Sequence, residues 1–443
     1  MDADHSVLIL TSSILERTDM MPSFGLLSVL VTLGALFSFL SYRVLRLPTT
    51  IGTMLLSLAA ASALIVGGHT VPALREHANL LVAGIDFNAV VLHGMLAFLL
   101  FAGALQLDLK QLSYERVSVL SLAVFATALS TVLVGVLFKE ALSLAGIPIG
   151  MTGALLFGAL ISPTDPIAVL EMLQRVGAPP ELKIQLAGES LFNDGVGAVI
   201  FVALLGAAKP GSADHGLPSL ATFGSLLLLQ AGGGIALGAT LGYLTYRLIR
   251  MVDSYRVEVM MTLALAMGGY VLADNLHLSA PLEAVAAGLM VSGTARRFAM
   301  SSTTRDHLEK FWELIDDILN VVLFLLLGLQ LLVLPLSVSL LMAGLIAIPV
   351  VLVARFVSVT VVVRTLAVCR QRVTGNVMVL TWGGLRGALA VALALSLPQG
   401  AGGERNLLLA ATYVAVVFSI LVQGLTISPL LRRLQARLGN VPC

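Results

Sequence analysis

The stretch that decides the fold of this chain is residues 184–208, which read IQLAGESLFNDGVGAVIFVALLGAA. At about 1.5 Å of rise per residue, a helix of this length crosses the hydrocarbon core of a bilayer. The stretch nevertheless carries two acids, Glu189 and Asp194, although a charge at the centre of a membrane helix costs roughly 2.5–3.5 kcal/mol even on the most lenient scale. Such acids face other protein segments or water, and their default interpretation is a site for an ion or a proton. A buried polar network with a purely structural role is the alternative.

Helical spacing places the polar side chains of this stretch on two neighbouring faces. Ser190 and Asp194 are separated by one helical turn and share a face. Glu189 and Asn193 have the same spacing and lie about 100° further round the helix. One membrane helix therefore presents a hydroxyl, an amide and two carboxylates to its neighbours.

The composition of the whole chain fits a helical membrane protein. Of its 443 residues, 58% are hydrophobic and only 12% are charged, and the mean hydropathy is +0.98. A soluble domain does not have this composition, whereas a polytopic membrane protein does. The net charge of +1 gives no indication of a nucleic-acid partner. The two cysteines, Cys369 and Cys443, have neither metal-ligand spacing nor the context of a disulfide, and we expect no cofactor.

Apolar segments of about 20 residues follow one another along the chain with short connections. We expect about 13 membrane helices, of which the ninth is short and the fifth and twelfth are interrupted, and no soluble domain. Residues 302–313 are predicted to form a polar, amphipathic surface helix that leads into the tenth. The segments are 24–42, 50–67, 87–106, 117–138, 147–175, 183–208, 219–247, 257–276, 279–294, 314–335, 337–363, 374–398 and 406–430.

The basic residues between these segments indicate the orientation of the chain. Apart from two arginines inside segments, 19 of the 24 lysines and arginines fall in one set of alternate connections. The opposite set contains only Arg17, Arg75, Lys139, Lys209 and Arg405. Because positive charge is retained on the cytoplasmic side, the asymmetry predicts an external N-terminus and a cytoplasmic C-terminus.

Two of the apolar segments contain residues that break helices. In the fifth, residues 162–166 read SPTDP, and each proline removes a backbone donor and clashes with the preceding turn. In the twelfth, residues 382–387 read WGGLRG, with three glycines and the cation of Arg386. Backbone freed in this way is tolerated in a membrane only where it lines a cavity or other protein segments. Both breaks are therefore expected to lie inside the protein, with Asp165 at the first of them.

The two broken segments are seven spans apart, so they correspond to each other if the chain contains two six-helix repeats. Paired broken helices in corresponding halves indicate the midplane site of an inverted-repeat transporter. We therefore interpret residues 1–443 as a single transmembrane domain. Repeat one covers about 24–208, a linking helix about 219–247, and repeat two about 257–430.

The candidate site combines acids with neutral oxygen ligands. Asp194, Asp165 and Ser190, together with the backbone carbonyl of Thr164, offer the hard oxygens that a partly dehydrated monovalent cation prefers. Two carboxylates in a pocket of low dielectric repel each other, so one of them can hold a proton when no cation is present. A group that binds either H⁺ or Na⁺, and never both, is sufficient for exchange.

Other residues in the apolar segments have a structural interpretation. Arg386 is expected to neutralise Glu189, because an unpaired buried arginine is costly. Arg355 lies deep in the eleventh segment and needs a partner that the sequence does not name, and Glu283 is interpreted as a solvated residue near the outer mouth. The glycines of the seventh segment predict close helix packing, with a dimer contact as one setting for it; they are Gly232, Gly233, Gly234, Gly238 and Gly242.

Four motifs occur in order along the chain. They are SPTDP at 162–166, GESLFNDG at 188–195, FWE at 311–313 leading to FLLLGL at 324–329, and WGGLRG at 382–387. Together they resemble the NhaP/NHE-type sodium–proton antiporters of the monovalent cation:proton antiporter superfamily. The match covers essentially the whole chain, and the four motifs together are highly specific.

The resemblance implies a fold and a mode of action. The chain would be an all-α polytopic secondary active transporter, not an enzyme, with 13 helices in two inverted six-helix repeats whose fifth and twelfth helices are unwound. It would lie in the cytoplasmic (inner) cell membrane and form a homodimer among membrane lipids. It would exchange monovalent cations for protons by elevator-like alternating access and contribute to pH homeostasis.

The resemblance also implies roles for individual residues. The residues implied to bind the transported Na⁺ are Asp194, Asp165, Thr164, Ser190 and Asn193. Asp194 would be the carrier of both cation and proton, and Glu189 would pair with Arg386. An asparagine immediately before the carrier aspartate resembles the electroneutral members of the family, which favours one Na⁺ per H⁺.

One departure from the family pattern leaves the ion open. Residues 99–105 read LLFAGAL, with Ala102 where some members have an acid. K⁺/H⁺ exchange by the same fold is therefore the alternative to exchange of Na⁺ or Li⁺. An intramembrane aspartyl protease using Asp165 and Asp194 would need a Gly-X-Gly-Asp motif, which the sequence lacks. An ion channel would have little need for a titrating acid at Asp194.

Overall fold

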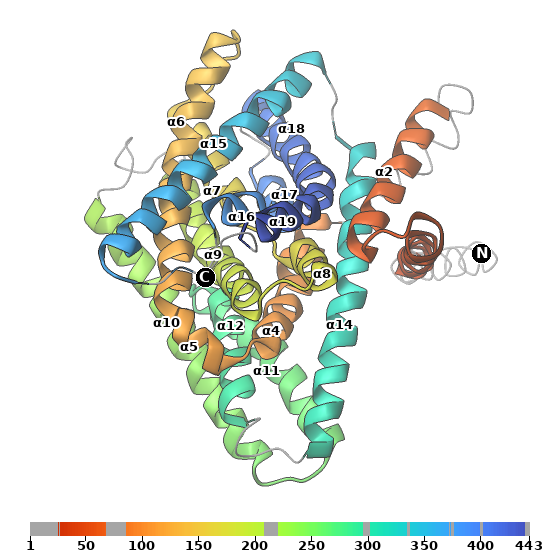
Figure 1. Ribbon diagram of the computed structural model, residues 1–443, viewed down its shortest axis with the longest axis vertical. Coiled ribbons are helices and arrows are strands. Elements are labelled where there is room, and N and C mark those ends of the chain that lie inside the picture. Colours follow the sequence, from red (N-terminus) through yellow and green to blue (C-terminus); the bar gives the residue numbers. More distant parts are fainter. Residues whose placement is uncertain are drawn as a thin grey trace, which may run out of the picture. The chain divides into compact units, whose positions relative to one another are not determined.

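The regular secondary structure of the chain is helical throughout the part that the structure describes (Figure 1). This computed structural model describes residues 25, 27–67, 86–207, 220–295, 302–334, 337–371, 373, 376–398 and 402–438. Both terminal segments and Cys443 lie outside the described residues, as do Arg17, Arg75 and Lys209 of the charge pattern. The described residues form two compact units, one within Met1–Ile85 and Asn320–Val333, the other within Asp86–Leu319 and Leu334–Cys443.

Small residues hold the first unit together. Its elements are a helix over Leu27–Leu45 whose last turn is the π-turn η1 (Ser41–Leu45), α2 (Thr49–Gly67), the final part of α14 (Ser302–Leu329) and the 3₁₀ turn η5 (Gln330–Leu332). The hydroxyl of Ser57 lies against Gly328, where a Cβ would collide with it, and it donates to the carbonyl of Met54 at 2.9 Å. Glycine at this position therefore allows two membrane helices to approach closely.

The second unit contains both broken helices and the long helix that carries the acids. Its first elements are η2 (Ala89–Met95), α4 (Leu96–Gln106), α5 (Leu109–Ser121), η3 (Leu122–Ala126), α6 (Thr127–Leu144), α7 (Met151–Ile161), α8 (Ile167–Val176), α9 (Pro180–Ala207) and α10 (Leu220–Ile249). The remainder are α11 (Tyr255–Asn275), α12 (Ala280–Met290), η4 (Val291–Ala295), the first part of α14, α15 (Val338–Val368), α16 (Val377–Trp382), α17 (Ala388–Leu395), α18 (Gly402–Phe418), η7 (Ser419–Gln423) and α19 (Gly424–Leu438).

The predicted all-α polytopic fold is confirmed. Ten helices within the described residues are long and apolar enough to cross a membrane. The other three predicted segments are the short α12 with η4, the broken pair α7–α8 and the broken pair α16–α17. The residues at 302–313 are continuous with the tenth span in α14 and do not form a separate helix. The fourth span is longer than predicted, because the carboxylate of Asp108 accepts from the N–H of Lys110 at 2.8 Å and starts a helix there.

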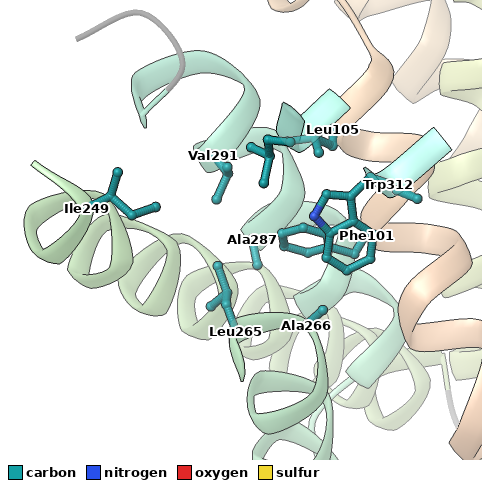
Figure 2. Packing of buried hydrophobic residues seen from close by; sticks show 10 residues of the cluster. Phe101, Leu105, Ile249, Leu265, Ala266, Ala287, Val291 and Trp312 are labelled. Carbon is teal, nitrogen blue, oxygen red and sulfur yellow. The ribbon is translucent and has the colours of Figure 1, made fainter. Parts of the chain in front are cut away.

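A hydrophobic core joins five helices of the second unit, α4, α10, α11, α12 and α14, with a further residue from the turn η4. Figure 2 shows the indole of Trp312 lying over the ring of Phe101, with ring centroids 4.7 Å apart. The indole N–H donates to the hydroxyl of Thr262 at 3.1 Å, which satisfies the polar atom of this buried side chain. The cluster consists of Phe101, Ala102, Leu105, Ile249, Leu265, Ala266, Ala287, Val291, Leu308 and Trp312.

The glycine-rich face of α10 packs against α12 of the same chain. A Cβ on Gly234 would collide with the carbonyl of Ser279, and one on Gly238 with the carbonyl of Glu283. The close helix packing predicted for these glycines is thus present, but its partner is a neighbouring helix within the protein. No second subunit is needed to explain them.

Candidate functional site

The breaks in the fifth and twelfth spans cross each other. The helix α7 ends before Pro163 and α8 begins after Pro166, while α16 and α17 are separated by residues 383–387. At the crossing, the N–H of Asp165 donates to the carbonyl of Leu385 at 2.7 Å, which forms an isolated antiparallel bridge. This bond satisfies two backbone groups that the breaks remove from their helices.

Glycine in the second break allows the first break to come this close. The side chain of Asp165 packs directly on Gly387, and a Cβ at position 387 would collide with the carboxylate. The ring of Pro163 packs in the same way on Gly197 of α9. The crossing therefore depends on two positions where the backbone has no side chain.

The helix α9 is attached to the crossing by hydrogen bonds to Thr164. The N–H of Thr164 donates to Oδ1 of Asn193 at 3.1 Å, and Nδ2 of Asn193 donates to the threonine hydroxyl at 2.8 Å. That hydroxyl also bonds the hydroxyl of Ser190 at 2.9 Å. All three side chains are buried. Both polar atoms of Asn193 are thus engaged by one residue, so the structure gives Asn193 a bracing position, and ion ligation by it stays a prediction.

The two aspartates share one electrostatic environment. Asp165 and Asp194 are each partly accessible, unlike the buried residues that hold them, and they are close enough for their charges to repel each other. Asp165 accepts one hydrogen bond, from the N–H of Ile167 at 2.9 Å. Within the described residues, the carboxylate of Asp194 makes no hydrogen bond or ion pair, which leaves its oxygens available for a ligand.

The predicted ion pair between Glu189 and Arg386 is wrong. Glu189 pairs with Arg355, with 2.5 Å between Oε1 and Nη2, and both side chains are buried. Arg355 also donates to the carbonyl of Leu380 at 3.3 Å, and it reaches this position because its guanidinium packs on Gly384. Glu189 is therefore the partner of Arg355 that the sequence could not name.

Arg386 is used at the end of the fifth span instead. Its Nη1 donates to the carbonyl of Ser162 at 2.5 Å and to that of Pro163 at 3.1 Å. These carbonyls lie at the proline break and at the C-terminus of α7, where the helix dipole attracts a cation. Arg386 still lies within electrostatic range of Glu189 and Arg355, so one group of charges surrounds the crossing.

Two residues at the crossing were missed by sequence reasoning. Ser419 accepts from the N–H of Arg386 at 2.9 Å, and Gln423 donates to the carbonyl of Trp382 at 3.3 Å. Their signal in the sequence is a serine and a glutamine one turn apart in residues 414–425, where every other residue is apolar or glycine.

Glu283 is the second correction. It was interpreted as solvated, but it is fully buried, and neither of its carboxylate oxygens has a hydrogen-bond partner in the described part of the chain. Its carboxylate lies against Gly269 of α11.

The donor set of the crossing suits a monovalent cation. Carboxylates, hydroxyls and freed backbone carbonyls are hard oxygen ligands. The family model described as "sodium/hydrogen exchanger, transmembrane" matches residues 28–433. The chain belongs to the sodium/hydrogen exchanger family. Together with the relatives given next, this match confirms the predicted resemblance to NhaP-type antiporters.

Individual relatives agree with this assignment. The chain is 44% identical over 418 residues to the Na⁺/H⁺ antiporter NhaP of Pseudomonas aeruginosa, covering 93% of this chain and 97% of the relative. It is 33% identical to the Na⁺/H⁺ antiporter NhaH of Halobacillus dabanensis, covering 88% and 93%. The structure of the sodium proton antiporter MjNhaP1 from Methanocaldococcus jannaschii matches with a TM-score of 0.71 at 21% identity, over 94% of this chain and 99% of that one. At this identity the structural match supports the fold.

Proposed function

We propose that this exchanger carries Na⁺ (or Li⁺) in one direction and H⁺ in the other, with Asp194 as the carrier of both. The observation that supports this most directly is the Asp165–Asp194 pair: two partly accessible carboxylates that repel each other beside two crossing helix breaks. A cation or a proton relieves that repulsion, and both cannot occupy the same carboxylate at once.

The neighbouring residues complete the site. Asp165 supplies a second carboxylate, and the hydroxyls of Ser190 and Thr164, with the carbonyl of Thr164, supply neutral oxygens. Asn193 holds Thr164 in position by two hydrogen bonds. The site needs no resident cofactor, because the transported ion is itself the ligand.

The charges around the crossing favour electroneutral exchange. The ionisable groups around the crossing include three carboxylates, those of Asp165, Glu189 and Asp194, and the two guanidinium groups of Arg355 and Arg386. With all five ionised, the empty site has one negative charge in excess, and one Na⁺ or one H⁺ makes it neutral. A neutral site crosses a medium of low dielectric at far smaller cost than a charged one. Loaded states therefore move and the empty state does not, which couples one Na⁺ to one H⁺.

The movement itself and the assembly are part of the same proposal. We infer that the crossing helices carry the ion by an elevator-type motion within a homodimer in the cytoplasmic membrane, with the N-terminus outside and the C-terminus in the cytoplasm. The family assignment and the multi-pass fold support a membrane location.

A K⁺/H⁺ exchanger of the same fold is the second candidate. The observation that favours it is Ala102, which lies in the buried core around Trp312 in place of an acid. Without a carboxylate from this helix the site has fewer charged ligands, and the strongly hydrated Na⁺ depends on such ligands more than K⁺ does.

Proton flux in proteoliposomes tests the proposal. A pH gradient is imposed, and Na⁺, Li⁺ and K⁺ are added in turn to the wild type and to Asp194→Asn. We expect Na⁺ and Li⁺ to dissipate the gradient in the wild type, independently of membrane potential, and the response to be lost in the variant. A response to K⁺ alone would establish the second candidate. Full activity in Asp194→Asn would show that another group is the carrier.

A further inference from the structure

The unwound stretch of the twelfth span, residues 383–387, needs partners for its backbone groups because lipid provides none. Leu385 obtains one from the other break, where its carbonyl accepts from Asp165. The N–H of Arg386, and the carbonyl of Trp382 at the end of α16, are bound by side chains of the last span.

These side chains belong to Ser419 and Gln423, the first and last residues of the π-turn η7. The N–H of Arg386 donates to Oγ of Ser419 at 2.9 Å, this hydroxyl donates to Oε1 of Gln423 at 2.6 Å, and Nε2 of Gln423 donates to the carbonyl of Trp382 at 3.3 Å. Because the serine donates to Oε1, the amide NH₂ group must face the tryptophan carbonyl. The bonds therefore form one chain with a single direction.

Both side chains are almost completely buried, with 1% exposure for Ser419 and 3% for Gln423. A hydrogen bond in such a place is costly to lose, because its partner is left without water to replace it. The π-turn is also an uncommon irregularity of an α-helix that often marks functional positions. In this protein it begins and ends with the two residues that bind the break.

One end of the hydrogen-bonded chain is Arg386, the residue that connects the two breaks. The backbone of Arg386 is bound by Ser419, and its side chain reaches the carbonyls of Ser162 and Pro163 in the fifth span. The preceding residue bonds the N–H of Asp165. Displacement of the backbone at Arg386 would therefore move both connections to the segment that presents the Asp165 carboxylate.

We propose that Ser419 and Gln423 are positioning residues for ion exchange, which hold the unwound part of the twelfth span so that Asp165 meets the cation in the correct place. The proposal rests on the proposed exchange function, although neither residue touches the ion. It assigns to the last span a role in ion affinity and not only in packing.

The first test compares transport parameters of Ser419→Ala and Gln423→Leu with the wild type in proteoliposomes. We expect the KM for Na⁺ to rise about fivefold or more in each variant, the effect of losing one buried hydrogen bond, with a smaller change in maximal rate. Ser419→Thr keeps a hydroxyl and should restore the wild-type KM. A wild-type KM and pH profile in folded Ser419→Ala would overturn the proposal, since a purely structural role lowers only the amount of active protein.

Thr412→Val provides the matched control. Thr412 lies on α18 and is fully buried, and its hydroxyl donates to the carbonyl of Leu408 in its own helix at 2.7 Å. The variant removes a buried hydroxyl from the same span without touching the break, so its KM should equal that of the wild type. An equal rise in KM in this control would also overturn the proposal.

The second test is independent of the transported ion. Hydrogen–deuterium exchange followed by mass spectrometry measures protection of the amides in residues 383–387. We expect faster exchange there in Ser419→Ala and unchanged exchange in Thr412→Val. Unchanged exchange in Ser419→Ala would refute the proposal that Ser419 holds the unwound stretch. Absence of cation-coupled proton flux in the wild type would refute only the proposed function. The hydrogen–deuterium exchange test would still apply, because it measures how firmly residues 383–387 are held when no ion is present.

Discussion

The ion pair between Glu189 and Arg355 can be tested by a double-mutant cycle. Glu189 is fully buried and Arg355 is 1% exposed, so neither charge has water to compensate for a lost partner. Removing one member of such a pair costs about 3–5 kcal/mol, whereas replacing both with apolar residues of similar volume is often neutral. We therefore expect Glu189→Gln and Arg355→Met each to destabilise strongly, and the double variant to recover about 2–3 kcal/mol as coupling energy.

The assay is unfolding of the purified protein in detergent by a denaturing detergent titration, followed by tryptophan fluorescence. The same cycle with Arg386→Met serves as the comparison, because Arg386 donates to backbone carbonyls and not to Glu189. Its coupling to Glu189 should be below about 1 kcal/mol, as for residues that interact only through space.

The result that would refute the reasoning is a reversal of the two coupling energies. If Glu189 couples to Arg386 more strongly than to Arg355, the pairing at the crossing is the one that the sequence suggested. Equal and small couplings would show that water reaches both arginines, and that burial does not set the energetics of this cluster.

Two glycine pairs give further predictions. Gly387→Ala places a Cβ on the carboxylate of Asp165, so cation-driven proton flux should fall at least about tenfold at normal expression. Gly403→Ala is the control and should be active, because its Cβ meets no atom within 4 Å. Equal activity of the two variants would contradict the close contact between Asp165 and Gly387. Gly238→Ala should destabilise the protein by about 1–3 kcal/mol in the same unfolding assay, because its Cβ meets the backbone of α12, whereas Gly232→Ala on the same helix should be neutral. Equal stability of the latter two would argue against close α10–α12 packing.

The breaks could be predicted because their cause is local. Pro163 and Pro166 remove backbone hydrogen bonds wherever they occur in a helix, and three glycines weaken the stretch 382–387. The order and number of the spans were equally accessible, since each needs only a long apolar run. Asp165 and Asp194 could each be identified as candidates for a similar reason, because each is an acid within an apolar segment.

The choice of partner for Glu189 was not predictable in this way. Arg355 and Arg386 are both arginines in apolar spans, and the true partner is 166 residues away in sequence. What decides between them is the position of each backbone in space and the missing side chain at Gly384. Glu283 was misjudged for a related reason. It lies in the first turn of a helix capped by Ser279, and such a helix start is typical of a membrane boundary. Only the tertiary structure shows that the residue is buried.

The burial of the Glu189–Arg355 pair also bears on the salinity in which the protein works. Dissolved ions weaken attractions between exposed charges beyond about 8 Å at physiological salt, and beyond about 3 Å at 1 M. This pair is 2.5 Å apart and out of reach of the electrolyte. The framework that holds the acids in place therefore keeps its strength as external sodium rises. Under the proposed function, only the accessible carboxylates of Asp165 and Asp194 respond to the sodium concentration.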